Sequence, residues 1–448
     1  LRKRKKIKFE YAFLNKIYFE TLIALNNGND AETFLAESFG VLIFSGLNKE
    51  YEKELMVMKK KILSAILATL MVGAMFTGCG SSSDSSSSKS ASSDGTSSAA
   101  GEASGDVSEL QGKIDKYKGV PEFDTASFKG EAFDAKTAMA GKKWMTIPGT
   151  SSNPFNQIIC EEISEVAGKV GFTCDVLENQ GAAEEHIAGL NSASQKGYSL
   201  VDLQAGPTPE TLGAQIQDCI DNGVKVVTSH LTGYEQEVSP VSGNMGAGYY
   251  EIAGLLADWA IVNSGTDCNV LVMVSEEITS TESMENGIKD EFAKYAPNAT
   301  VDFVNVAIVD WGSKCQSETE NYLSAHPDTD YIISIYDSAT QYIVPAVKST
   351  GSSAKIVAYN GTPFAVDYVK SGDIEMLVGE DLLTIAYATV DYEMRTDLGM
   401  TQVEEPTLYR VWTSENVDEA LNADGKCEYG IGYGDSAKQA YEKLWGLS

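Results

Sequence analysis

The chain has 448 residues, enough for two or three domains, and a formal net charge of −30 from 34 Lys+Arg and 64 Asp+Glu. So acidic a chain argues against nucleic acid and against an anionic lipid surface as partners. The seven cysteines form no C-x-x-C pair, so we expect neither a zinc site nor a compact disulfide framework.

Residues 58–79 have the layout of a secretory signal. Three lysines precede an apolar run, Ile62 to Phe76, which is shorter than the roughly 20 residues that span a bilayer. The ending Phe76-Thr77-Gly78-Cys79 resembles a bacterial lipobox, which implies that 58–78 is a cleaved lipoprotein signal peptide and that Cys79 carries a lipid. An uncleaved membrane anchor is the alternative, and the Ser-rich tract directly after Cys79 favours the lipoprotein.

The remaining residues before the core divide into three segments. We expect residues 1–57 to be a non-native extension translated from upstream of the true start at Met58, with a cytoplasmic extension as the alternative. Residues 79–108 are Ser, Ala, Gly and Asp with almost no apolar bulk, which predicts a flexible linker. Residues 109–141 are interpreted as an extended lead-in that packs on the first lobe.

From Lys142 short apolar strands alternate with amphipathic helices. The expected strands are 144–147, 173–177, 199–203 and 224–228, and the expected helices are 154–170, 184–196 and 209–222. Asn153 is the expected N-cap of the first helix and Pro154 its first residue. Four β-α units in a row are typical of a parallel, doubly wound sheet.

A second series of strands and helices follows the first. The expected strands are 269–274, 300–306, 331–335, 355–359 and 374–378, and the expected helices are 245–263, 282–295, 314–325, 338–349, 363–370 and 382–397. Residues 408–412 are expected to be a return crossing, and 436–445 a C-terminal helix. The sequence therefore predicts two α/β lobes in tandem.

Several phrases occur in a recognisable order. They are Asn153-Pro154-Phe155, Asp221 to Val227, Ala325-His326-Pro327-Asp328 followed by Tyr336-Asp337, Val357 to Pro363, and Val369 to Gly372. Together they resemble the ribose/galactose-type solute-binding proteins of bacterial ABC importers, over about residues 142–399. The resemblance implies the type I periplasmic-binding protein fold: α/β, with two Rossmann-like lobes of parallel sheet joined by a three-segment hinge. It assigns 142–240 plus 382–405 to lobe one and 241–381 plus 406–448 to lobe two.

In this family the ligand lies at the carboxyl ends of the strands, where open α/β sheets bind ligands. The ligand-binding positions that the resemblance implies are Asn153, Phe155, Asn156, His230, Met284, Trp311, Tyr336, Asp337, Tyr359, Asn360 and Glu380. Each also has a structural interpretation, such as a helix cap for Asn153 and Asp337 or a core position for Phe155 and Trp311.

Four of these positions depart from the family pattern. The family usually has Asp at the position of His230, Arg at that of Met284 (or Glu282, if the register slips), Asp at that of Asn360 and Gln at that of Glu380. A larger or less hydroxyl-dense ligand, such as an oligosaccharide or a sugar derivative, is therefore an alternative to a monosaccharide.

The resemblance implies an extracytoplasmic monomer, lipid-anchored to the cell membrane through Cys79. It would capture a small carbohydrate-like ligand by hinge closure and deliver it to an ABC permease. A sensory protein that presents its ligand to a membrane receptor and a binder of a nucleoside or other non-sugar solute are the alternatives.

We expect no enzyme activity, cofactor or metal, because the sequence shows no Ser-His-Asp arrangement, metal-ligand cluster or P-loop. The glycines of Gly243 to Gly248 have the wrong spacing for a dinucleotide loop. Most of the cysteines after Cys79 are expected to be small buried residues, with one disulfide among them left open: Cys160, Cys174, Cys219, Cys268, Cys315 and Cys427.

Overall fold

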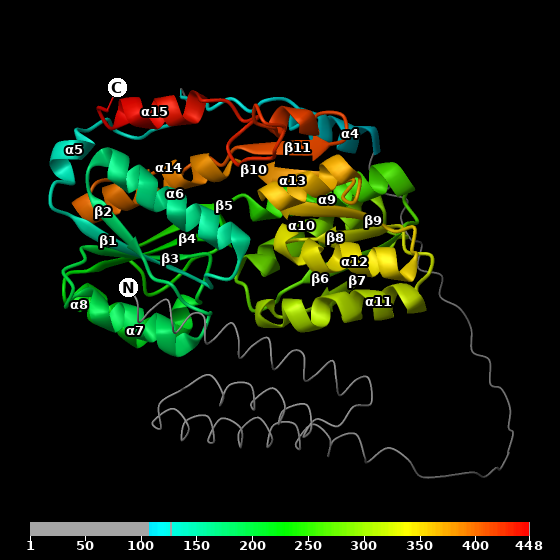
Figure 1. Ribbon diagram of the computed structural model, residues 1–448, viewed down its shortest axis with the longest axis horizontal. Coiled ribbons are helices and arrows are strands. Elements are labelled where there is room, and N and C mark those ends of the chain that lie inside the picture. Colours follow the sequence, from blue (N-terminus) through cyan, green and yellow to red (C-terminus); the bar gives the residue numbers. More distant parts are fainter. Residues whose placement is uncertain (1–106, 126–127, 448) are drawn as a thin grey trace, which may run out of the picture. The chain divides into compact units, whose positions relative to one another are not determined.

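The computed structural model of the chain describes residues 107–125 and 128–447 (Figure 1). The expected upstream extension, signal peptide, lipidated Cys79 and nearly all of the Ser-rich linker lie outside these residues. None of the helices in the described ranges is both long and apolar enough to cross a membrane.

Lobe one is built on a five-stranded parallel sheet in the order β2-β1-β3-β4-β5. Its strands are β1 (Lys143–Pro148), β2 (Thr173–Val176), β3 (Leu200–Gln204), β4 (Lys225–Gly233) and β5 (Gly243–Ala247). Its helices include α6 (Pro154–Val170), α7 (Ala183–Ala193) and α8 (Gly213–Asp221), the last preceded by a 3-10 turn, Pro209–Leu212. Every residue of β3 is buried, as expected for a parallel strand covered by helices on both faces.

Helix α6 shows how local sequence sets the entry to the cleft. The Asn153 side chain accepts a hydrogen bond from the backbone N–H of Phe155 at 2.8 Å, and Pro154 occupies the first turn. The helix ends at Gly171, whose φ of 108° is favourable for glycine. The predicted bounds of this helix are confirmed.

Lobe two is built on a six-stranded sheet in the order β11-β10-β9-β8-β6-β7. Its strands are β6 (Asn269–Val274), β7 (Thr300–Asn305), β8 (Tyr331–Ser334), β9 (Lys355–Asn360), β10 (Met376–Glu380) and β11 (Tyr409–Thr413). Its helices are α9 (Tyr249–Ser264), α10 (Ser280–Tyr295), α11 (Gln316–Ala325), α12 (Thr340–Thr350) and α13 (Pro363–Ser371). Only β11 runs antiparallel to its neighbour, so the expected return crossing is an edge strand of this sheet.

The chain crosses between the two sheets three times. It leaves lobe one after β5, returns after β10 to form α14 (Leu382–Leu398), and leaves again before β11. Residues along α14 share an apolar core with α6, which places this helix in lobe one. The three-segment hinge of the predicted fold is therefore confirmed.

The expected helix 245–263 is wrong at its start. Met245 lies in β5, which pairs with β4 in lobe one, and α9 begins at Tyr249. A side chain at Gly246 would meet the backbone oxygen of Gly233 at 2.9 Å, so glycine permits these segments to approach closely. Glycines weaken the apolar alternation by which a strand is recognised, which explains why β5 was not predicted. Because β5 belongs to lobe one, the first crossing lies beyond the expected boundary at residue 240.

The expected extended lead-in is wrong over its first part. Residues 107–116 form helix α4 (Val107–Lys116), which packs on α9 of lobe two through the fully buried Leu110 and Ile114. Lys113 Nζ lies 2.8 Å from Glu291 Oε1 of α10. The spacing of Leu110 and Ile114 puts both on one helix face, which explains why this short segment is helical. The chain then reaches lobe one, where α5 (Ala135–Ala138) packs.

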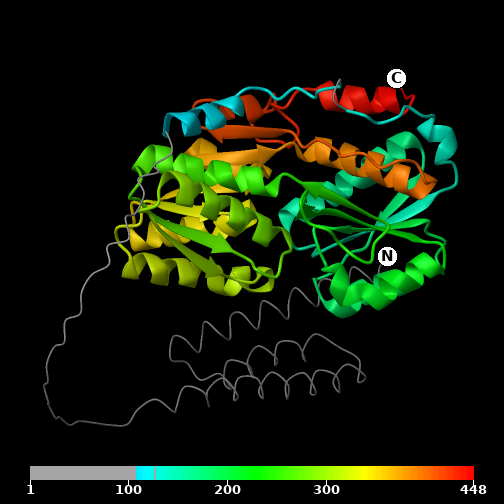
Figure 2. The ribbon, with the colours of Figure 1, turned by 180° about the vertical axis from the view of Figure 1, so that it is seen from behind.

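The C-terminal residues also span both lobes. After β11 in lobe two, helix α15 (Ser436–Leu444) packs against α14 of lobe one, and the ring of Trp445 stacks on Tyr387 with centroids 5.5 Å apart. The sequence-based division counted this helix with lobe two. Figures 1 and 2 both show the segment between α4 and α5 running beside this C-terminal segment. We call the described residues of these two segments, 117–125 with 128–134 and 414–435, the straps.

Candidate functional site

The carboxyl ends of strands from both sheets meet at a buried group of polar and aromatic side chains. His230 lies on β4 of lobe one, and Glu380 ends β10 of lobe two. His230 Nε2 is 2.8 Å from Glu380 Oε2, and this hydrogen bond joins the two lobes. We call the set that surrounds it the inner cluster: Phe155, His230, Tyr249, Tyr359, Asn360 and Glu380.

The imidazole of His230 is held from three sides. Its Nδ1 lies 2.5 Å from the hydroxyl of Tyr249, which also lies 2.9 Å from the His230 carbonyl oxygen. The Phe155 ring lies 4.8 Å from the imidazole, centroid to centroid. His230 has a φ of 52°, which is uncommon for a residue other than glycine and occurs where the surroundings fix the backbone.

Glu380 and Asn360 retain unused hydrogen-bonding capacity. The Tyr359 hydroxyl donates to Glu380 Oε2 at 2.5 Å, but Glu380 Oε1 and Asn360 Oδ1 are buried and have no partner among the described residues. Burial raises the pKa of the Tyr249 and Tyr359 hydroxyls well above their usual range, so both keep their protons. A buried acceptor without a donor costs about 1–3 kcal/mol, so these two atoms favour a ligand that donates.

Asp337 holds the turn that follows β9, next to the inner cluster. Its Oδ2 accepts from the backbone N–H of Gly361 at 3.0 Å and from the N–H and hydroxyl of Thr362 at 2.8 and 2.7 Å. Burial raises the pKa of Asp337 to about 6. These contacts fix the turn after β9 that presents Asn360, and they give Asp337 a structural role.

Met284 is placed differently from the other predicted positions. Its side chain is fully buried in the apolar core of lobe two, on α10. A ligand could touch it only if that core opened. Glu282, its alternative in a shifted register, is exposed at the start of the same helix.

Trp311 and Tyr336 form a second aromatic group in lobe two. Trp311 opens a π-helical turn, Trp311–Cys315, and its indole N–H lies 2.9 Å from Ser275 Oγ and 3.0 Å from the carbonyl oxygen of Val306. The two rings lie 6.2 Å apart, and the Tyr336 hydroxyl contacts the hydroxyls of Ser280 and Thr281. Both residues are largely buried, so their rings are part of the wall of lobe two.

A cavity of about 330 Å³ lies between the lobes beside Asn153 and Trp311. We call it the outer cavity, and its lining residues are Thr150, Ser152, Asn153, Pro154 and Gln180 from lobe one and Ile308, Val309, Trp311, Gly312, Ser338, Gln341 and Tyr342 from lobe two. The Ser338 hydroxyl donates across the lobes to Asn153 Oδ1 at 3.2 Å.

A second interlobe cavity of about 220 Å³, the side cavity, is mostly apolar and includes Asn156 and Leu231 in its lining. Thr150, Ile308 and Val309 line both cavities. The Asn156 side chain itself donates to the carbonyl oxygen of Thr150 at 3.1 Å. The two cavities are therefore neighbours, separated by residues of the loops after β1 and β7.

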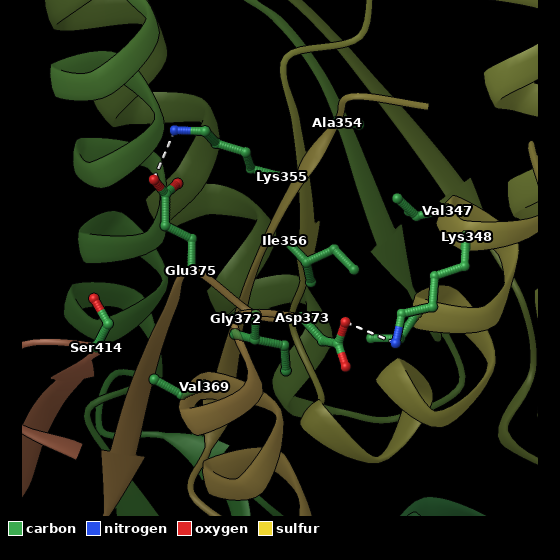
Figure 3. Close-up of a pocket in the computed structure, with 12 residues that line it drawn as sticks. Val347, Lys348, Ala354, Lys355, Ile356, Val369, Gly372, Asp373, Glu375 and Ser414 are labelled. Carbon is green, nitrogen blue, oxygen red and sulfur yellow. Dashed lines mark hydrogen bonds and ion pairs between the residues drawn. The ribbon is translucent and has the colours of Figure 1, made fainter. Parts of the chain in front are cut away.

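A different cavity of about 310 Å³ lies at the amino ends of β9 and β10 (Figure 3). Figure 3 shows its two ion pairs, Lys348 with Asp373 and Lys355 with Glu375, each 2.7 Å long. Because its charged groups neutralise one another and lie at the opposite end of these strands from Glu380, it is not part of the cleft between the lobes.

The sequence analysis missed Tyr249, Gln180 and Tyr342. Tyr249 opens α9 directly after the first crossing, and the residue that follows a lobe crossing is a signal that could have pointed to it. Gln180 and Tyr342 have no comparable signal, because they reach the outer cavity only through loop and helix placement. Among the residues that the structure describes, no group of three His, Cys, Asp or Glu side chains could hold a metal ion.

Comparisons with known proteins agree with this architecture. A family model described as periplasmic binding protein domain matches residues 145–394, whereas no curated protein sequence matches the chain. A solved structure of the Caulobacter myo-inositol binding protein is 20% identical, with a TM-score of 0.55, over 61% of this chain and 94% of that chain.

Two further solved structures are similar. An Agrobacterium vitis ABC transporter solute-binding protein with bound α-D-tagatopyranose is 18% identical, with a TM-score of 0.55, over 62% of this chain and 96% of that one. A periplasmic solute-binding protein from Actinobacillus succinogenes with bound D-allose is 16% identical, with a TM-score of 0.54, over 62% and 99%. At these identities the likeness supports the two-lobed fold.

Proposed function

The chain belongs to the periplasmic binding protein domain family, and from this premise we propose that it captures a small carbohydrate between its lobes and delivers it to an ABC importer. The observation that carries the proposal is the inner cluster, which joins the lobes and keeps two buried acceptors, Glu380 Oε1 and Asn360 Oδ1, without donors. Hydroxyl groups of a sugar or polyol are donors that would satisfy both.

The surroundings of these acceptors favour a neutral, hydroxylated ligand. The rings of Phe155 and Tyr359 in the inner cluster, and that of Trp311 in the outer cavity, offer apolar faces against which the C–H groups of a sugar can pack. No Lys or Arg occurs among the described residues that line the inner cluster and both interlobe cavities, so an anionic ligand would lack a counter-charge. The ligands named for the similar structures, myo-inositol, tagatose and allose, are neutral polyols and sugars.

Capture follows from the position of the cluster at the three crossings. When the lobes close, His230 of lobe one meets Glu380 of lobe two, and Asn153 meets Ser338. A ligand that hydrogen-bonds to both lobes binds the closed form more tightly and shifts the population toward it. The closed form is then the one that the permease recognises.

The location and partners of the protein are part of the same proposal. We propose a lipid anchor on Cys79, an extracytoplasmic monomer and an ABC permease as the partner. A sensory protein with the same ligand, or a nucleoside as the ligand, is the alternative. No catalytic role is proposed for any residue.

A thermal-shift screen tests the proposal. The chain is heated with hexoses, pentoses, polyols, nucleosides and amino acids, and a ligand present at 100 times its Kd should stabilise the folded state by about 2.7 kcal/mol. A shift by a sugar or polyol alone supports the proposal. A shift by a nucleoside alone, or by no carbohydrate, contradicts it.

A further inference from the structure

The order of the strands separates the cleft into two regions. His230 lies near the carboxyl end of β4 and Glu380 ends β10, and both strands lie next to the crossing segments, whereas β2 and β7 are free edges of their sheets. Gln180 follows β2, and Val309 follows β7. The outer cavity therefore lies toward the edges farthest from the crossings, beyond the inner cluster.

The outer cavity has its own set of groups for binding a ring. Its lining includes three residues with side-chain amides, Asn153 and Gln180 of lobe one and Gln341 of lobe two, and two aromatic residues, Trp311 and Tyr342. Gln341 uses its Nε2 to donate to the carbonyl oxygen of Ser338, which leaves its amide oxygen available. The side-chain amide of Gln180 is exposed and has no partner within the described part of the chain, whereas its backbone N–H donates to Glu185 Oε2. Planar amides beside aromatic faces suit a second hydroxylated ring.

Val309 adds an apolar contact to the same place. Its side chain is 74% exposed, although it is apolar and lines both interlobe cavities. An exposed apolar side chain that faces a cavity rimmed by polar groups is a typical contact for the apolar face of a ligand. It lies in the 3-10 turn Ile308–Asp310 after β7, and Thr150 of the loop after β1 lines the same two cavities.

Asn153 connects the outer cavity to the inner cluster. Its side chain lines the cavity and accepts from Phe155 N–H, and the Phe155 ring contacts His230. Asn153 and Phe155 therefore link the lining of the outer cavity to the inner cluster. We infer that the outer cavity binds the second sugar ring of a disaccharide, an inference that rests on the proposed carbohydrate-binding function.

The test compares hexoses with disaccharides built from them, namely glucose and galactose with cellobiose, maltose and lactose. Calorimetric titration of the full chain gives Kd for each sugar, and we expect at least one disaccharide to bind ten times or more tighter than its hexoses. Gln180→Ala and Tyr342→Ala should then weaken the disaccharide at least tenfold and change hexose binding less than twofold. The matched control is Gln217→Ala, an exposed glutamine on α8 outside both cavities, which should change neither.

The outcomes separate the two proposals. If hexoses bind as tightly as the disaccharides and the outer-cavity variants bind every sugar as the parent does, the second-ring inference is overturned and the carbohydrate function stands. If the variants weaken hexoses and disaccharides equally, the outer cavity holds the first ring and the inference is again overturned. If no sugar binds, both fail.

Discussion

Glu380 offers the sharpest test of the site, through the substitution Glu380→Gln. The change keeps the shape of a buried side chain and removes its charge. Its bond to the Tyr359 hydroxyl lies within lobe two and is present with or without ligand, so it affects stability more than binding. The bond to His230 joins the lobes, and Oε1 is the acceptor that a ligand hydroxyl would fill.

The expected loss of affinity follows from two of these bonds, the one to His230 and the one to the ligand hydroxyl. A hydrogen bond to a charged group contributes about 1.5–3 kcal/mol and a neutral one about 1, so each loses about 1 kcal/mol in the variant. Two such bonds in the closed, liganded form amount to about 2 kcal/mol, or a Kd about 30-fold weaker.

The assay is calorimetric titration with the carbohydrate that gives the largest thermal shift. The matched control is Glu375→Gln, because Glu375 directly precedes the strand that Glu380 ends and pairs with Lys355 in the cavity of Figure 3. Glu375→Gln should leave Kd unchanged. A Glu380→Gln protein that stays folded and binds with the parent Kd would refute the assignment of this carboxylate to the site.

Three further predictions concern stability and the walls of the site. Trp311→Phe removes the indole hydrogen bonds, for example that to Ser275, and should lower the free energy of unfolding in urea by about 1–2 kcal/mol while changing sugar Kd less than threefold; a larger loss of affinity would mean that the indole N–H serves the ligand. Gly361→Ala should lower the free energy of unfolding by about 1–3 kcal/mol or more in the same urea assay, because Gly361 has a φ of 95° and a Cβ there would lie 2.8 Å from a backbone Cα. An unchanged midpoint of unfolding would contradict this. Burial raises the pKa of Asp202 to about 7 and that of Glu393 well above its usual range, so the folded state holds more protons than the unfolded one. The calorimetric Tm should therefore fall from pH 5 to pH 8, and it should fall less in Asp202→Asn. A Tm that rises over this interval would contradict the argument.

Much of the fold could be predicted because its boundaries carry local chemical signals. The bounds of α6 follow from the cap at Asn153, Pro154 in the first turn and Gly171 at the end. The apolar run of β6 also has the predicted bounds. β5 was missed because its glycines, which allow close strand contact, erase the pattern that marks a strand. Helix α4 was missed because only three apolar residues, Val107, Leu110 and Ile114, mark its buried face over a short segment that follows the Ser-rich tract.

The site was harder to predict than the fold, because its contacts join distant segments. His230 and Glu380 are 150 positions apart, and only the strand order brings their side chains together. The family resemblance predicts Met284 and Asp337 as ligand-binding residues. In the structure Met284 is buried in the core of lobe two, and Asp337 Oδ2 accepts hydrogen bonds from the turn after β9. The sequence predicts which residue lies at a strand end. Packing and nearby hydrogen-bond donors determine which of its atoms can still bind a ligand.

The packing of α4 on lobe two determines which lobe is connected to the chain ahead of Val107. Leu110 and Ile114 are fully buried there, so any force applied to the chain ahead of Val107 reaches lobe two first. With the proposed anchor at Cys79, the membrane tether joins lobe two, and lobe one is held to the membrane through lobe two. The straps are two further chain connections between the lobes, in addition to the three crossings between the sheets, so any change in the angle between the lobes must also move them.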